Sequence, residues 1–266
     1  MTSRKKPDPH TAAWITLEDN LEMVGHILLY TRQEARALEK LANSGSHKFV
    51  TIMKSVEGND PANRDSIAKS ITKLTGELKR IETKRDEIMA RFDTTNMWQV
   101  VMLVTCAEAY LQDVLEAAAA LDVDLMNESE QAAKYEDVIS APSLGALALE
   151  LRRRWARRWL EGGGPTSWIT RLTKMGARGY PPDLAKRLEL IWGIRHNVVH
   201  SAGIATSDLV KRHPAAAKAV GDRIQIPMPQ MTNFFTNVQA FLQPTEDYFL
   251  KRYPALQASV ATKATK

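Results

Sequence analysis

Apolar or small residues recur every three or four positions over two long segments in the first third of the chain. These segments cover residues 17–38 and 67–88. In the second, Arg85 stands where an apolar residue is due, and the positions between are mostly Lys, Glu, Arg and Asp. Such spacing lines up the apolar side chains along one face of an α-helix. It predicts two long amphipathic helices within residues 14–96, the second with Asp65 or Ser66 as its N-cap. The pattern is compatible with an antiparallel helical arm, a dimer seam or ordinary packing within a bundle.

The rest of the chain also shows helical patterns, separated by glycine, proline and serine. Residues 97–121 are nearly all apolar in their first half, which is typical of a central, buried helix. Three further helices are predicted. They cover residues 144–160, residues 181–203 with Gly203 as the C-terminal cap, and the segment from about Thr232 onward. Residues 221–230 have an extended pattern, with at most a short edge strand.

These elements predict an all-α protein, a helical bundle with an N-terminal long-helix arm. Runs of alternating β-branched residues are nearly absent, so no sheet is expected. We divide the chain into a flexible tail, the arm, a helical domain and a second flexible tail, at residues 1–13, 14–96, 97–253 and 254–266. The arm is also able to pack into the same domain.

The composition favours a cytoplasmic protein without a membrane anchor. The first ten residues are charged and lead into no apolar segment, unlike a signal peptide. No stretch reaches the roughly 18 uncharged apolar residues that a membrane span needs. The single cysteine, Cys106, cannot form an internal disulfide, which fits a reducing cytoplasm. One cysteine also excludes a zinc site built on cysteines.

Positive charge is concentrated in one part of the chain. Residues 141–213 hold 13 Lys and Arg against 5 Asp and Glu, whereas the remainder holds 23 against 26. A local basic excess of this kind is typical of a surface that binds a polyanion such as RNA.

The most basic stretch is LRRRWARRWL, residues 151–160. Trp155 and Trp159 are four residues apart, so they lie on one side of a helix. They either pack into the core or stack against the bases of single-stranded RNA. The arginines form a solvated face that we expect to bind RNA, and they are Arg152, Arg153, Arg154, Arg157 and Arg158.

The stretch IWGIRHNVVHSAG, residues 191–203, places polar side chains within an apolar helix. Its aliphatic positions share a buried face, and the polar residues are expected at the edge of the core. These polar residues are the candidate catalytic group: Arg195, His196, Asn197 and His200. The two histidines project from one face, as two metal ligands would, but no third ligand and no glutamate base accompany them. We therefore predict no metal and no other cofactor.

An Arg-x4-His pair at a helix end, with polar residues directly after the arginine, resembles the motif of the HEPN superfamily. In this chain the matching residues are Arg195, His196, Asn197 and His200. The buried helix with Glu108, Tyr110 and Leu111 looks like the family's early core helix, and the segment GDRIQI is similar to the extended piece of its RiboL-PSP-like branch. The resemblance covers roughly residues 97–250. It implies a small all-α domain, and many such domains are metal-independent endoribonucleases of toxin–antitoxin, abortive-infection and phage-defence systems.

The residue types suit cleavage of RNA by its own 2′-OH. Histidine titrates near neutral pH, so His200 is expected to take or give a proton. Arginine offers a planar fork of donors and stays charged, so Arg195 is expected to stabilise charge in the transition state. His196 or Asn197 would hold the scissile phosphate or fix a tautomer. Glu108 interrupts an apolar run, and it either forms an ion pair that positions Arg195, has a partner elsewhere or is exposed.

Two functions are compatible with these features. The first is a metal-independent endoribonuclease, active as a homodimer on RNA and restrained by an antitoxin or another defence protein. A dimer axis would bring two arginines and two histidines around one cleft. The second is a non-catalytic HEPN-like module that dimerises and binds RNA, a nucleotide or a partner protein. The presence of both motif ends, Arg195 and His200, favours the enzyme.

Overall fold

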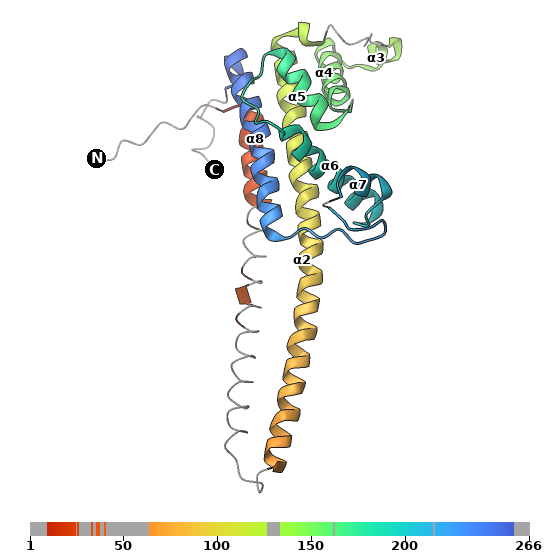
Figure 1. Cartoon of the computed structure of the whole chain (residues 1–266). Helices are drawn as coiled ribbons and strands as arrows, with labels where there is room; N and C mark the ends of the chain where they lie inside the picture. The colour runs from red at the N-terminus through yellow and green to blue at the C-terminus, as the bar shows by residue number, and fades with distance from the viewer. Residues whose placement is uncertain are drawn as a thin grey trace, which may run out of the picture. The chain divides into compact units, whose positions relative to one another are not determined.

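The computed structural model describes residues 10–24, 64–126, 134–161, 163–214 and 216–257, together with five single positions between 26 and 40. The chain forms two compact units (Figure 1). The larger unit comprises residues 1–24 and 100–266, and the smaller unit comprises residues 25–99. Residues 12–24 are helical, as predicted, but they belong to the larger unit and not to the arm. Most of the remaining first predicted helix lies outside the described residues.

Helix α2 (Arg64–Leu121) is a single helix of 58 residues. The sequence predicted two helices here, one ending near residue 96 and another beginning at 97, and this division is wrong. The helix contains one glycine, Gly76, and no proline, so no residue stops it. Asp65 and Ser66 lie inside its first turn, which also overturns their prediction as N-cap.

The core of the larger unit forms around the second half of α2. Its fully buried side chains there include Val104, Tyr110 and Leu115. The other helices are α3 (Tyr135–Ser140), α4 (Leu144–Glu161), α5 (Gly164–Met175), α6 (Leu184–Ser201), α7 (Ser207–Arg212) and α8 (Met228–Arg252), with short 3-10 turns at Val123–Met126 and Pro254–Leu256. Helix α6 is in contact with α5, α7 and α8, and its buried face carries Leu188, Ile191 and Ile194. The all-α fold predicted from the sequence is confirmed.

The predicted extended segment is present, although the described residues form no named strand. Ile204 and Arg223 make one isolated antiparallel bridge, and Ile224 and Ile226 after it are buried. The last helix, α8, begins at Met228 and not near Thr232, and it passes through Pro244 without a break. None of the described helices has the length and apolar character to cross a membrane.

Candidate functional site

The polar group predicted at residues 195–200 lies in the last two turns of α6. The helix ends where expected, because Ala202 and Gly203 both adopt left-handed backbone angles, with φ of 51° and 77°. The N–H of Gly203 donates to the carbonyl of Asn197 at 3.1 Å, which closes the last turn. The helix is therefore regular up to Ser201, and its side-chain directions follow ideal helical spacing.

Arg195 forms the ion pair with Glu108 that was one of the expected alternatives. Its Nη2 lies 3.8 Å from the Glu108 Oε2, and each side chain is 31% exposed. The other oxygen of Glu108 accepts a hydrogen bond of 2.9 Å from the Trp192 Nε1. The Nε of Arg195 is buried and has no hydrogen-bond partner, although the side chain as a whole is partly exposed. Glu108 on α2 thus holds both Trp192 and Arg195 of α6.

His196 and His200 are both exposed and lie together on one face of α6. Their ring centroids are 4.5 Å apart, with an angle of 40° between the ring planes. The structure therefore brings these two predicted residues into direct contact, with their rings open to solvent.

Asn197 does not belong to this exposed group. Its side chain is only 3% exposed, although the sequence analysis expected it at the edge of the core. Its Nδ2 donates to the Gly193 carbonyl at 2.8 Å, and its Oδ1 accepts from the Thr206 N–H at 3.1 Å. Because both polar atoms are used within the fold, Asn197 anchors the chain after α6, and it is not available to hold a phosphate. The expectation that Asn197 performs this role is wrong, and His196 is the remaining candidate.

Arg195 and His200 point in different directions from one helix. Five residues separate them, which corresponds to roughly 140° around α6 and about 7.5 Å along it. Two pockets among the described residues lie elsewhere. One has a volume of about 460 Å³ between α2 and α4, and the other lies beside α3 and α4. A single chain therefore displays the motif on an open surface and not within either of these pockets.

The five arginines of α4 are not equivalent. Arg154 makes a bidentate pair with Asp137 at 2.9 and 3.1 Å, and this hydrogen bonding raises the pKa of Arg154 and lowers the pKa of Asp137. The Nε of Arg153 lies 3.5 Å from Glu116. Arg152 is half-buried, whereas Arg157 and Arg158 are exposed. The last two are the best placed for an external anion.

The two tryptophans of α4 do not form a joint stacking platform. Trp155 is buried, with 6% exposure, so the core alternative is confirmed for this residue. Trp159 is half-buried, and the guanidinium of Arg171 lies over its ring at 5.5 Å. Neither ring is free to stack with a base along its whole face.

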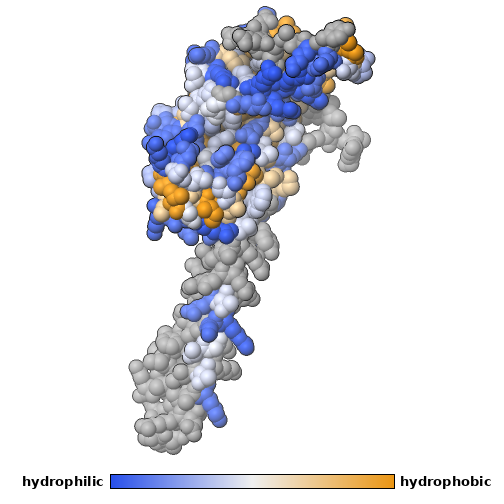
Figure 2. All heavy atoms as spheres, turned by 90° about the vertical axis from the view of Figure 1, so that its right-hand side faces the viewer, coloured by the Kyte–Doolittle hydropathy of each residue, from blue (hydrophilic) through white to orange (hydrophobic). Residues whose placement is uncertain are grey.

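The surface that includes the end of α6 is mixed in character. Figure 2 shows hydrophilic side chains over much of this side of the larger unit, together with a cluster of hydrophobic ones. The exposed apolar residues near the end of α6 include Val199, Ile204 and Val220, at 46%, 40% and 61% exposure. Backbone hydrogen bonds from Ala205 to Asp222 and from Gly221 to Ala205 hold the segments around Ile204 and Val220 side by side.

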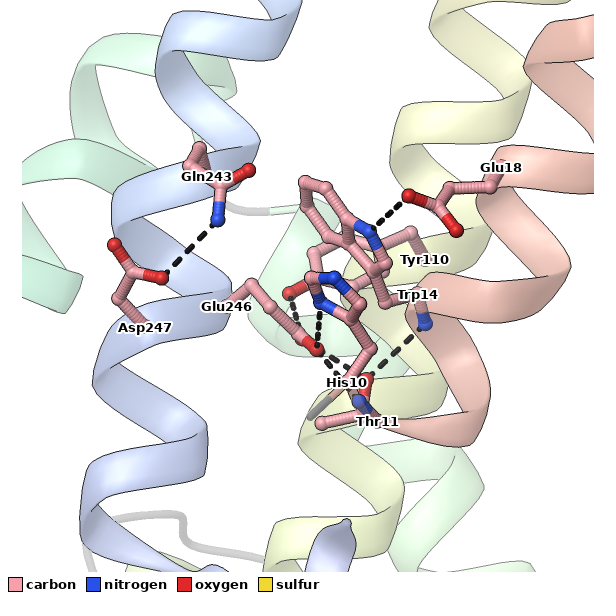
Figure 3. A network of polar contacts seen from close by, with 8 residues as sticks. All are labelled: His10, Thr11, Trp14, Glu18, Tyr110, Gln243, Glu246 and Asp247. Carbon is pink, nitrogen blue, oxygen red and sulfur yellow. Dashed lines mark hydrogen bonds and ion pairs between the residues drawn. The ribbon is translucent and has the colours of Figure 1, made fainter. Parts of the chain in front are cut away.

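Glu246 is a buried carboxylate that the sequence analysis did not single out. It is 0% exposed and accepts hydrogen bonds from the Thr11 N–H at 2.6 Å, the Thr11 Oγ1 at 2.9 Å and the Tyr110 hydroxyl at 2.9 Å (Figure 3). The Nδ1 of His10 lies 3.7 Å away, and the His10 ring stacks on Trp14. Burial and the neighbouring carboxylate raise the pKa of Tyr110 well above its ordinary value.

This network is a structural anchor, because the carboxylate has no exposed surface and its neighbours saturate it. It joins three segments that are distant in sequence: residues 10–14, α2 and α8. One signal in the sequence could have identified it. Glu246 lies among the residues of α8 that face the core, between Leu242 and Phe249, where a carboxylate needs buried partners.

Comparison with known proteins gives no relative for this chain. No family model matches it, and the comparisons found no match among curated proteins or solved structures.

Proposed function

We propose that this protein is a metal-independent endoribonuclease of the HEPN type. The observation that carries the proposal is the arrangement at the end of α6, where Arg195 is held by Glu108 and His200 is exposed beside His196. A permanent cation and a titratable imidazole, both accessible to solvent, are the two groups that cleavage by the RNA 2′-OH requires.

In the proposed reaction, the 2′-oxygen of a ribose attacks the adjacent phosphorus and the bond to the 5′-oxygen breaks. The products are a 2′,3′-cyclic phosphate and a free 5′-OH. His200 takes the proton of the 2′-OH or gives a proton to the departing 5′-oxygen. Arg195 donates hydrogen bonds to the phosphate oxygens as their charge grows. His196 contacts the phosphate or orients the ring of His200, which lies 4.5 Å away between centroids.

The proposed active form is a homodimer. Arg195 and His200 diverge on one helix, so a complete site is built from the arginine of one copy and the histidine of another. The exposed side chains of Val199, Ile204 and Val220 supply apolar surface beside the motif for such a contact.

The shared site can be tested by mixing two inactive variants. Arg195→Ala and His200→Ala chains, unfolded together and refolded, form mixed dimers in which one of the two sites keeps both groups. Since half of the dimers are mixed, we expect about a quarter of the wild-type activity to return. A mixture that stays as inactive as either variant alone would show that both groups act within one chain.

The primary test is incubation of the purified protein with total RNA in EDTA. We expect fragments with 2′,3′-cyclic phosphate ends from the wild type, and at least about a hundredfold slower cleavage by His200→Ala and by Arg195→Ala. Matched controls are His26→Ala, in the smaller unit, and Arg187→Ala, an exposed arginine near the start of α6. If the two motif variants cleave as fast as these controls, the proposed function is wrong.

The second candidate is a non-catalytic module of the same fold that binds RNA. One observation favours it: Arg195 and His200 leave α6 roughly 140° apart, so a single chain does not bring them together on one phosphate. This function predicts RNA that is bound but stays intact, with an affinity that falls steeply as salt rises. Replacing both exposed arginines, Arg157 and Arg158, with alanine would then reduce the slope of that salt dependence. Replacing Arg154, which is bound to Asp137, would reduce the slope less.

We place the enzyme in the cytoplasm, in a toxin, abortive-infection or phage-defence setting, where an antitoxin or another defence protein restrains it. Support comes from the resemblance at Arg195, His196 and His200 and from the basic surface of α4.

A further inference from the structure

His196 and His200 form an exposed pair of imidazoles one helical turn apart. Both rings are open to solvent, and their centroids are 4.5 Å from each other with a tilt of 40°. In the proposed nuclease His200 alone carries the proton and His196 has a supporting role, but two solvent-exposed imidazoles at this distance can also act together as ligands of one ion.

The separation of the two rings is close to that of imidazoles that share a metal ion. A Zn–N bond of about 2.0–2.1 Å and a tetrahedral angle place the centroids of two coordinating rings about 5 Å apart. The observed 4.5 Å is within reach of this value by small rotations about the side-chain torsions. The backbone does not need to move, because α6 is regular through Ser201 and closed by the hydrogen bond from Gly203 to Asn197.

We propose that His196 and His200 bind a first-row transition-metal ion such as Zn²⁺ or Cu²⁺, reversibly and as the only two protein ligands from one chain. Among the described residues, no group of three or more His, Cys, Asp and Glu side chains is placed to hold a metal. Water therefore completes the coordination. The site differs from a catalytic zinc centre, which takes three protein ligands and keeps one open position.

Within a single chain, the charges around the pair permit this binding. Arg195 is the neighbouring cation in the sequence, and its guanidinium is directed to Glu108, 3.8 Å away on α2. This pairing offsets part of the positive charge that would otherwise repel a divalent ion.

The ligand type determines which ions bind. Imidazole nitrogens favour Cu²⁺ over Ni²⁺ and Zn²⁺, and these over Co²⁺ and Mn²⁺, whereas Mg²⁺ prefers oxygen ligands. Binding of Zn²⁺ and Ni²⁺ without binding of Mg²⁺ is thus the signature of the site, because carboxylates also bind Mg²⁺.

A consequence follows that rests on the proposed function. The ion occupies a nitrogen of His200 that proton transfer needs, so a bound metal inhibits RNA cleavage, and a chelator restores it. The site would make the enzyme sensitive to the free level of transition metal.

The test is a calorimetric titration of the metal-free, full-length protein with Zn²⁺, Ni²⁺ and Mg²⁺ in a buffer that does not chelate. We expect one site per chain for Zn²⁺ and Ni²⁺ and none for Mg²⁺. His196→Ala and His200→Ala should each weaken binding by at least about tenfold, since each removes one of two ligands. The matched control His26→Ala removes a histidine of the smaller unit and should bind as the wild type does.

Both variants are expected to fold, because the substituted side chains are exposed and alanine is favourable within a helix. Equal thermal unfolding of the metal-free variants and the wild type checks this. If either variant binds Zn²⁺ as tightly as the wild type, or if Mg²⁺ competes at equal concentration, the proposed site is wrong.

Different results would refute the metal site and the proposed nuclease function. If the protein cleaves RNA, half-inhibition should occur at the Zn²⁺ concentration that half-saturates the calorimetric site, and saturation without inhibition would refute the blocking of His200. A chain that binds Zn²⁺ through both histidines but cleaves no RNA in EDTA supports the metal site and contradicts the nuclease.

Discussion

Replacement of Glu246 with alanine should destabilise the larger unit more than any other single polar substitution proposed for this protein. The carboxylate is fully buried and accepts three hydrogen bonds, two from Thr11 and one from Tyr110. Both partner residues are themselves only 2% exposed. Alanine leaves the Tyr110 hydroxyl and the Thr11 N–H without an acceptor and without access to water.

The size of the effect follows from the groups that lose their partners. A buried donor left unsatisfied costs about 1–3 kcal/mol, and Glu246→Ala leaves two such donors, the Thr11 N–H and the Tyr110 hydroxyl. We therefore expect Glu246→Ala to lower the free energy of unfolding by about 2–6 kcal/mol. Tyr110→Phe removes one donor and leaves the carboxylate with both Thr11 bonds, so its cost should be about 1–2 kcal/mol.

Urea denaturation monitored by tryptophan fluorescence measures both values, and hydrogen exchange locates the change. Because Thr11 is the link between Glu246 and residues 12–24, amides of that segment should lose protection in Glu246→Ala before those of the second half of α2. Glu246→Gln keeps the shape of the side chain and one acceptor oxygen. Its loss in free energy of unfolding should therefore lie between the losses of Glu246→Ala and Tyr110→Phe. A cost below about 1 kcal/mol for Glu246→Ala, or a larger cost for Tyr110→Phe, would refute the view that this carboxylate anchors the N-terminal segment.

Three further results are expected. Asn197→Ala should lower the free energy of unfolding by about 2–3 kcal/mol in urea, because two buried hydrogen bonds are lost; an effect near zero would mean that the amide is dispensable. Glu108→Gln should cost less than about 1 kcal/mol in stability, as its ion pair is partly exposed, but should slow RNA cleavage by at least about tenfold because Arg195 loses its anchor. Burial raises the pKa of Tyr180 to about 12, so the folded chain keeps a proton that the unfolded chain loses above about pH 10. The free energy of unfolding should therefore fall between pH 10 and 12, and fall less steeply in Tyr180→Phe.

Local patterns in the sequence predicted most of the helices and one important contact. Helical periodicity located α4 and α6, and Gly203 marked the end of α6 because its backbone angles are left-handed. The pair of Glu108 and Arg195 was among the expected alternatives because a carboxylate within an apolar run needs a partner.

Other features could not be inferred from local patterns. The sequence analysis placed a boundary after residue 96, but the polar residues at 93–96 do not prevent a helix, and α2 continues through them. The bonds of Glu246 to Thr11 span 235 positions, and no local pattern indicates such a partner. Asn197 was expected at the edge of the core, because periodicity gives the direction of a side chain but not the packing of the following loop against it.

The regularity of α6 constrains how the candidate site can work. A phosphate must be reached by its proton carrier and its cation together, with reacting atoms within about 3–3.5 Å. On α6, the side chains of Arg195 and His200 leave the helix roughly 140° apart. The ion pair with Glu108 fixes the arginine toward α2, whereas His200 lies against His196. One chain thus separates the two groups that the proposed chemistry must join, and the proposed homodimer would bring them together, since the arginine of one copy would face the histidine of the other.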